Sequence, residues 1–223
     1  MHIPDGFIDL PTSAAAGLIA ISGAAIAVKK ARNDLDDRTA PMAGLTAVFI
    51  FAVQMLNFPV AAGTSGHLLG GALATVLVGP YAASLALTVV LGIQALLFAD
   101  GGLSALGLNV LNMSILGVAS SYFTFALVKK LLPKVRSSIP LAAGIAGLVS
   151  VPFAAAGFSL EYAIGGTGTA PASTVAAAML STHVLIGIGE ALITMLTVSA
   201  IMATRSDLVY GWKSTKVELE VKS

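Results

Sequence analysis

The stretch that decides the fold is residues 39–99, TAPMAGLTAVFIFAVQMLNFPVAAGTSGHLLGGALATVLVGPYAASLALTVVLGIQALLFA, which contains no Asp, Glu, Lys or Arg. A membrane-spanning helix needs about 20 mostly apolar residues, so this run is long enough for more than one span. Further uncharged runs cover residues 101–128, 137–160, 162–189 and 191–204. We therefore expect a polytopic membrane protein.

Composition supports the same class. Of the 223 residues, 57% are hydrophobic and only 10% are charged, whereas a soluble domain is about 25% charged. The net charge of +1 offers no basic surface to a nucleic acid. Since the chain has no cysteine, disulfides, thiolate metal sites and cysteine nucleophiles are excluded.

Apolar runs and Gly/Pro breaks predict the helices. We expect them at residues 11–28, 42–58, 68–78, 81–98, 105–132, 140–158 and 173–204. The third segment is too short to cross a bilayer comfortably, so we expect it to be tilted or re-entrant. Gly79-Pro80 marks its end, because proline suits a first helical turn or a break.

The basic residues predict the topology. All twelve lie in three clusters, at residues 29–38, 129–136 and 205–222. Basic loops stay in the cytoplasm, and seven passes from an outer N-terminus put all three clusters there. We therefore predict an all-α integral membrane protein of about seven transmembrane helices, with the N-terminus outside and the C-terminus cytoplasmic. Residues 1–205 form one transmembrane domain, and residues 206–223 form a polar, frayed cytoplasmic tail.

The start of the chain carries a chelating pattern. A free Met1 amine, the His2 backbone nitrogen and His2 Nδ1 can close a five-membered and a six-membered ring on one cation. A histidine at position two leaves the fourth place of a nitrogen square empty, and His67 is the candidate for it. Such coordination suits Ni(II) or Cu(II), with Co(II) also plausible.

For His67 to meet the chelate, residues 1–10 must fold back into the helix bundle. Further polar residues are then candidates to orient the imidazoles. They are Asp5, Thr64, Ser65, Gln94, Asn109 and Asn112.

Three motifs in this chain resemble one family. Residues 1–6 (MHIPDG), residues 63–70 (GTSGHLLG) and residues 100–103 (DGGL) look like the CbiM/NikM family. These proteins are the substrate-specific components of energy-coupling-factor cobalt and nickel transporters. The resemblance runs from Met1 to about Arg205.

The resemblance implies a metal held by the Met1 amine, the amide and imidazole of His2, and the imidazole of His67. It also implies that Ni(II) or Co(II) is the transported substrate, with no bound organic cofactor. The membrane would be the cytoplasmic membrane of a prokaryote. The partners implied are a membrane scaffold subunit, cytoplasmic ATPase subunits and, for cobalt, a small accessory membrane subunit. The chain itself would be no enzyme, and it contains no G-x-x-x-x-G-K-[ST] phosphate loop.

Two other classes remain as alternatives. Ser65 in the sequence GTSG and His183 on a later helix could form a rhomboid-like intramembrane serine protease. A proton-coupled secondary transporter would use His183 and Glu190, with helices interrupted near Gly79-Pro80. These two ionisable residues share one face of the last helix. They either serve as a metal relay or proton-linked gate, or pack the bundle.

Overall fold

The computed structural model describes residues 1–32, 35–37, 39–59 and 65–212. This part of the chain is almost entirely helical. Its longer elements are α1 (Leu10–Ala31), α2 (Thr39–Gln54), α3 (Gly71–Val78), α4 (Pro80–Phe98), α6 (Gly117–Leu131), α7 (Ser138–Gly165) and α8 (Ala172–Arg205). A one-turn α5 (Leu106–Asn109) and a π-helical segment (Val110–Leu116) run continuously into α6. Strands β1 (Phe58–Pro59) and β2 (Ser65–Gly66) form a short antiparallel pair.

Five helical segments in the described part are long and apolar enough to cross a membrane. They are Leu10–Ala31, Pro80–Phe98, Leu106–Leu131, Ser138–Gly165 and Ala172–Leu208. The prediction of an all-helical, multi-pass membrane protein is thereby confirmed. The count of seven spans and the orientation of the two termini stay predictions.

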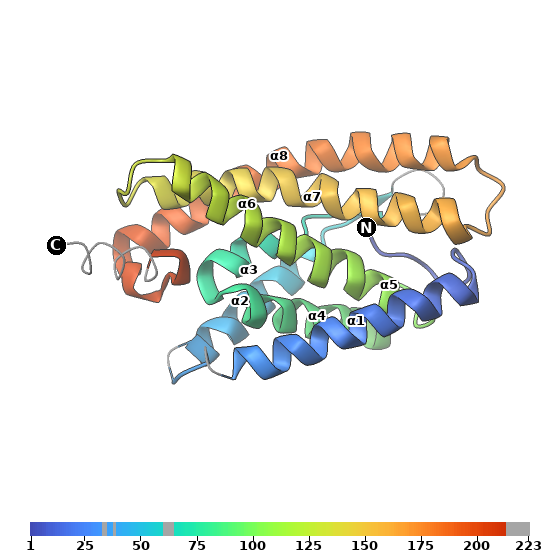
Figure 1. The fold of residues 1–223 in the computed structure, drawn as a ribbon, viewed down its shortest axis with the longest axis horizontal. Coiled ribbons are helices and arrows are strands. Elements are labelled where there is room, and N and C mark those ends of the chain that lie inside the picture. Colours follow the sequence, from blue (N-terminus) through green and yellow to red (C-terminus); the bar gives the residue numbers. More distant parts are fainter. Residues whose placement is uncertain (33–34, 38, 60–64, 213–223) are drawn as a thin grey trace.

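The helices gather the basic residues at one end of the bundle. In Figure 1 the end of α1, the turn from α6 to α7 and the end of α8 lie at the same end, on the left. Lys29 and Lys30 lie in the last turn of α1, Lys129 and Lys130 in that of α6, and Arg205 in that of α8. The segregation of charge along the sequence thus becomes a segregation in space.

Two predicted helix boundaries around the third helix are wrong. The second helix ends at Gln54, not residue 58, and the third begins at Gly71, not residue 68. Residues 58–59 instead pair with residues 65–66. Gly70 has φ +80°, outside the helical region, so no helix can continue backward through it. His67 therefore precedes α3 rather than starting it.

The predicted shortness of the third helix is confirmed. With eight residues, α3 is less than half the length that a span requires. Gly79 ends it with φ +84°, and Pro80 occupies the first turn of α4. A half-helix therefore sits inside the bundle and contacts α4, α6, α7 and α8.

The expected fraying does not hold for residues 206–212. Val209 is fully buried, and Gly211 packs so closely on Phe125 that an added Cβ would lie 2.7 Å from its ring. The guanidinium of Arg136 lies 6.0 Å from the centre of the Trp212 ring. Residues 213–223 lie outside the described part of the chain.

Close packing of α1 on α5 depends on Gly107, which lies against the backbone of α1. A Cβ added to Gly107 would lie 2.5 Å from the Cα of Gly17, which is backbone and has little room to move. In lipid, van der Waals contact of this kind replaces the hydrophobic drive that holds helices together in water.

We therefore expect Gly107→Ala to destabilise the protein by about 1–3 kcal/mol, the usual effect of overpacking. Gly92→Ala is the matched control, because an added Cβ on that helical glycine of α4 meets nothing within 4 Å. The control should be neutral or gain up to about 1 kcal/mol from helix propensity. Thermal unfolding of the detergent-solubilised variants measures both, and equal melting temperatures would contradict the close contact.

Candidate metal centre

The first three residues lie inside the bundle. Met1 is 1% exposed, His2 4% and Ile3 0%, and Figure 1 shows the N-terminus among the helices rather than beyond their ends. A chain end is usually frayed unless other groups hold it, and here several hydrogen bonds hold it.

The side chain of Asn109 forms hydrogen bonds with both backbone groups of Ile3, as the backbone of a neighbouring strand would. The Ile3 N–H donates to Asn109 Oδ1 at 2.8 Å, and Asn109 Nδ2 donates to the Ile3 carbonyl at 3.2 Å. The Gly102 N–H donates to the same carbonyl at 2.8 Å. The backbone polar groups of Ile3 are thus satisfied although the residue is fully buried.

Asp5 fastens the next turn of the segment. Its Oδ1 accepts from the Ser104 N–H at 2.7 Å and from Ser104 Oγ at 2.6 Å. A Cβ on Gly102 would lie 2.3 Å from the Asp5 nitrogen, so only glycine permits this approach. Further along, the Asp9 N–H donates to the Gly165 carbonyl at 2.7 Å. Residues 1–9, which we call the plug, therefore contact both the loop before α5 and the end of α7.

The His2 ring is held from one side. Its Nε2 lies 3.1 Å from Gln94 Oε1, which can only accept, so Nε2 carries the proton. Nδ1 then has a free lone pair; it has no hydrogen-bond partner and lies 3.3 Å from Asp100 Oδ1. Burial and the charge of the nearby terminal amine lower the pKa of His2 to about 3, so the ring is neutral at neutral pH.

The His67 ring lies against the His2 ring. The two centroids are 4.6 Å apart and the planes are inclined by 30°. His67 Nδ1 lies 2.9 Å from the Leu68 carbonyl and donates to it, whereas its Nε2 is buried without a hydrogen-bond partner. Burial is the main cause that lowers the pKa of His67 well below its usual value, with smaller contributions from the charges of the terminal amine, His2 and His183.

The terminal amine is buried as well. Burial lowers the pKa of the Met1 amine to about 4, and the Asp100 carboxylate opposes this shift only in part. The amine is therefore neutral at neutral pH and keeps its lone pair. The neutral amine and the two neutral imidazoles are thus close enough for the charge of one to affect the pKa of another.

Side chains alone do not complete a metal site. Within the described residues, no group of three or more His, Asp or Glu side chains is placed to hold an ion. The chelate predicted from the sequence relies instead on backbone nitrogens, the Met1 amine and the His2 amide.

The predicted supporting residues separate into those that contact the plug and those that do not. Gln94 contacts His2, Asn109 contacts Ile3, and Asp5 contacts Ser104. Asn112 instead donates to Glu161 Oε2 on α7 at 2.6 Å. Thr64 lies outside the described residues, and Ser65 pairs through its backbone in β2.

Sequence reasoning missed the Asp100 side chain as a neighbour of His2. A signal was present, because Asp100 is the only charged residue between Thr39 and Val128. An isolated ionisable residue in an apolar run marks a functional position more often than a structural one. His183, by contrast, is buried in α8 with Nδ1 2.8 Å from the Met179 carbonyl.

Comparison with known proteins identifies the family. A family profile described as the cobalt uptake substrate-specific transmembrane region matches residues 2–208. A protein of Archaeoglobus fulgidus, provisionally named a fused nickel transport protein NikMN, is 38% identical over 94% of this chain and 68% of its own length. The cobalt transport protein CbiM of Sorangium cellulosum is 32% identical over 94% of each chain.

The fold agrees with the sequence relationship. The crystal structure of a transition metal transporter superposes with a TM-score of 0.85 at 31% identity, covering 91% of this chain and 93% of that one. The resemblance predicted from residues 1–6, 63–70 and 100–103 is thereby confirmed. The chain belongs to the CbiM family of cobalt uptake substrate-specific transmembrane proteins.

Proposed function

We propose that this protein captures Ni(II) or Co(II) at the outer face of a prokaryotic cytoplasmic membrane. It would act as the substrate-binding subunit of an ATP-driven energy-coupling-factor transporter. The observation that carries the proposal is the pair of stacked, buried imidazoles, each with one nitrogen that has no partner. Buried polar atoms are nearly always hydrogen-bonded. A bound cation would account for these two nitrogens, which are among eight buried side-chain atoms without a hydrogen-bond partner in the described residues.

Four nitrogens would bind the ion. The Met1 amine, the deprotonated His2 amide and His2 Nδ1 form the two chelate rings, and His67 Nε2 closes the square. The loss of one amide proton leaves a charge of +1 on the loaded centre. The carboxylate of Asp100, 3.3 Å from His2 Nδ1, offsets this charge in surroundings where an isolated charge is costly.

The sequence and the names of the relatives support the choice of ion. A square of nitrogen ligands suits Ni(II), with Co(II) next to it in the same affinity series. The Archaeoglobus relative is named for nickel and the Sorangium relative for cobalt. Cu(II) binds such sites more tightly by intrinsic affinity, so the supply of metal in the cell would help decide which ion is carried.

The proposed orientation follows from the basic end of the bundle. Placing the lysines of α1 and α6 in the cytoplasm agrees with the positive-inside rule and turns the plug segment outward. The ATP would be hydrolysed by separate cytoplasmic subunits coupled through a membrane scaffold subunit, with a small accessory membrane subunit for cobalt. A serine protease of Ser65 and His183, or a proton-coupled secondary transporter, is not favoured by the family to which the chain belongs.

The terminal amine offers the most direct test. Two extra residues before Met1 move the primary amine out of chelating position and leave every side chain intact, whereas a single extra residue would make His2 the third residue and create a new four-nitrogen chelate. We expect stoichiometric Ni(II) and Co(II) binding, measured by calorimetry on the purified protein, to weaken by about 100-fold or more, since two of four ligands depend on that end. The matched control adds the same two residues after Ser223 and should bind as the wild type does. Unchanged binding by the N-terminal extension would exclude the Met1 amine as a ligand.

Gln94 provides a second test, because it contacts His2 and would affect the metal only by orienting that ring. Gln94→Leu removes the acceptor for His2 Nε2 and should weaken metal binding by roughly 10- to 100-fold, as is usual for residues that orient a ligand. Gln94→Glu keeps an acceptor at the same place and should retain most of the affinity. Equal affinities in the two variants, with both folded by thermal unfolding, would show that this hydrogen bond does not orient the ring.

A further inference from the structure

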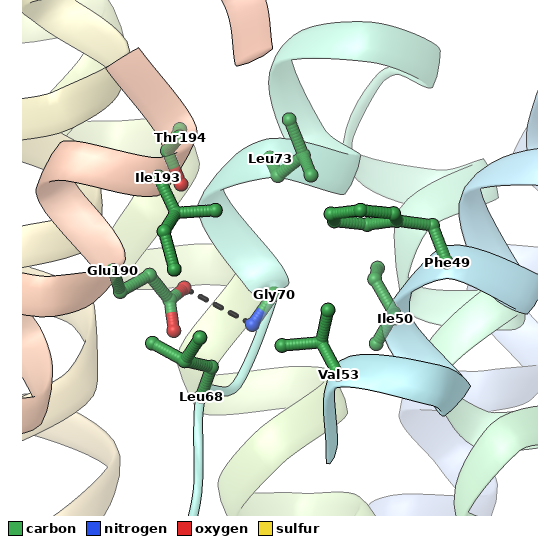
Figure 2. Close-up of a pocket in the computed structure, with 9 residues that line it drawn as sticks. All are labelled: Phe49, Ile50, Val53, Leu68, Gly70, Leu73, Glu190, Ile193 and Thr194. Carbon is green, nitrogen blue, oxygen red and sulfur yellow. Dashed lines mark hydrogen bonds between the residues drawn. The ribbon is translucent and has the colours of Figure 1, made fainter. Parts of the chain in front are cut away.

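Glu190 is a buried carboxylate that the proposed metal site does not use directly. It lies on α8 and is 2% exposed. Its Oε2 accepts from the Leu69 N–H at 2.6 Å and its Oε1 from the Gly70 N–H at 3.1 Å. Figure 2 shows the carboxylate turned toward Gly70, with Leu68 and Ile193 beside it.

These two N–H groups lie directly before α3, at its N-cap residue Gly70 and at the preceding Leu69. The first N–H groups of a helix have no partner within the helix and carry a partial positive charge. Gly70 precedes α3 and has no side chain to cap it. Glu190 therefore caps α3 from another helix, next to a cavity of about 20 Å³ lined mainly by apolar side chains such as Leu73 and Phe49. In such surroundings a charge-assisted hydrogen bond is strong and costly to lose.

One peptide group links this cap to the metal ligand. The Leu69 N–H that donates to Glu190 and the Leu68 carbonyl that accepts from His67 Nδ1 are the two ends of the same peptide unit. A peptide unit is planar and rigid, so fixing its N–H also fixes the direction of its carbonyl. That carbonyl sets the orientation of the His67 ring, and hence where Nε2 points.

Gln54 of α2 holds the next peptide unit. Its Nε2 donates to the Leu69 carbonyl at 2.7 Å, and Gln54 itself is fully buried. The segment after His67 is thus clamped between a side chain of α8 and one of α2. The φ of +80° at Gly70, where an added Cβ would meet the Ile50 side chain at 2.7 Å, then turns the chain into α3.

We infer that Glu190 is a positioning residue for metal capture, acting through the Leu68–Leu69 peptide unit to hold the His67 ring with Nε2 toward the ion. The inference rests on the proposed function. The hydrogen bond from the Leu69 N–H to a carboxylate also polarises the peptide unit, which makes the Leu68 carbonyl a better acceptor for His67 Nδ1–H. A better acceptor raises the basicity of the ligating nitrogen. Glu190 thus both orients and strengthens a ligand that it does not touch.

The experiment measures Ni(II) affinity by calorimetry in four proteins: wild type, Glu190→Gln, His67→Ala and the double variant. Glu190→Gln should weaken binding by about tenfold or more in the wild-type background. It should have little effect in the His67→Ala background, where only the ligands of residues 1 and 2 remain. A merely structural role would lower affinity by the same factor in both backgrounds, and that additivity would overturn the inference.

Glu161→Gln is the matched control. Glu161 is also a buried glutamate in a long helix, but it accepts a hydrogen bond from the side chain of Asn112 rather than from the segment after His67. Its replacement should leave the Ni(II) affinity within about twofold, a difference well below the tenfold that corresponds to 1.4 kcal/mol. An equal loss in both variants would mean that any buried carboxylate matters, and would also overturn the inference.

A readout without metal separates this inference from the proposed function. Amide hydrogen exchange of the peptide covering residues 67–73 should be faster in Glu190→Gln than in Glu161→Gln, because the Leu69 and Gly70 amides lose an acceptor. Unchanged exchange there overturns the inference whatever the metal does. A wild-type protein that binds neither Ni(II) nor Co(II) refutes the proposed function, whereas wild-type binding with an unaffected Glu190→Gln variant refutes the positioning role alone.

Discussion

The burial of the chain's first three residues is the constraint on which the rest of the structure depends. A terminal amine and an imidazole are expensive to remove from water. The protein meets this cost by pairing the Ile3 backbone with Asn109 and by placing Gln94 beside His2. Gly102 has to be glycine because the plug passes so close to it that a Cβ would overlap Asp5. Gly107 of α5 has to be glycine because a Cβ there would overlap the backbone of α1.

The same burial prepares the nitrogens chemically. Desolvation disfavours the charged form of an amine or an imidazole, and here it is the largest cause of the lowered pKa of Met1, His2 and His67. Each group therefore holds a lone pair at neutral pH. In water the terminal amine would be mostly protonated at neutral pH, whereas the fold excludes water from it and leaves its lone pair available. Asp100 supplies one negative charge beside these nitrogens.

The half-helix α3 follows the turn after His67 and packs against α4, α6, α7 and α8. A segment that stops in the middle of a membrane protein leaves its first N–H groups without partners, and they must be satisfied inside the protein. Glu190 accepts from the N–H of the N-cap residue Gly70 and from that of Leu69 before it, and Gln54 donates to the Leu69 carbonyl. The interruption at Gly70 and Gly79 thus places a precise turn directly after His67 while α8 and α2 hold it from two sides.

Much of the architecture was predictable because its signals are local. Uncharged runs longer than 18 residues, basic clusters at their ends and the Gly79-Pro80 break predicted the helical membrane fold, four of the five long spans within a few residues, and the short third helix. The fifth, α7, begins near its expected start and continues seven residues beyond residue 158. The chelate of Met1 and His2 was equally accessible, since its rings close within two adjacent residues.

The sequence by itself therefore determined that this chain folds in a membrane, and it determined the chemistry of its first residues. It treated Gln94 and Asn112 alike, and only packing showed that one contacts His2 and the other Glu161. It predicted a helix that begins directly after His67, and only the left-handed Gly70 and the β1–β2 pair showed that a turn separates His67 from α3. The physical reason is that hydrogen bonds between residues such as 2 and 94, or 69 and 190, depend on how helices pack, and no local pattern in the chain encodes those distances.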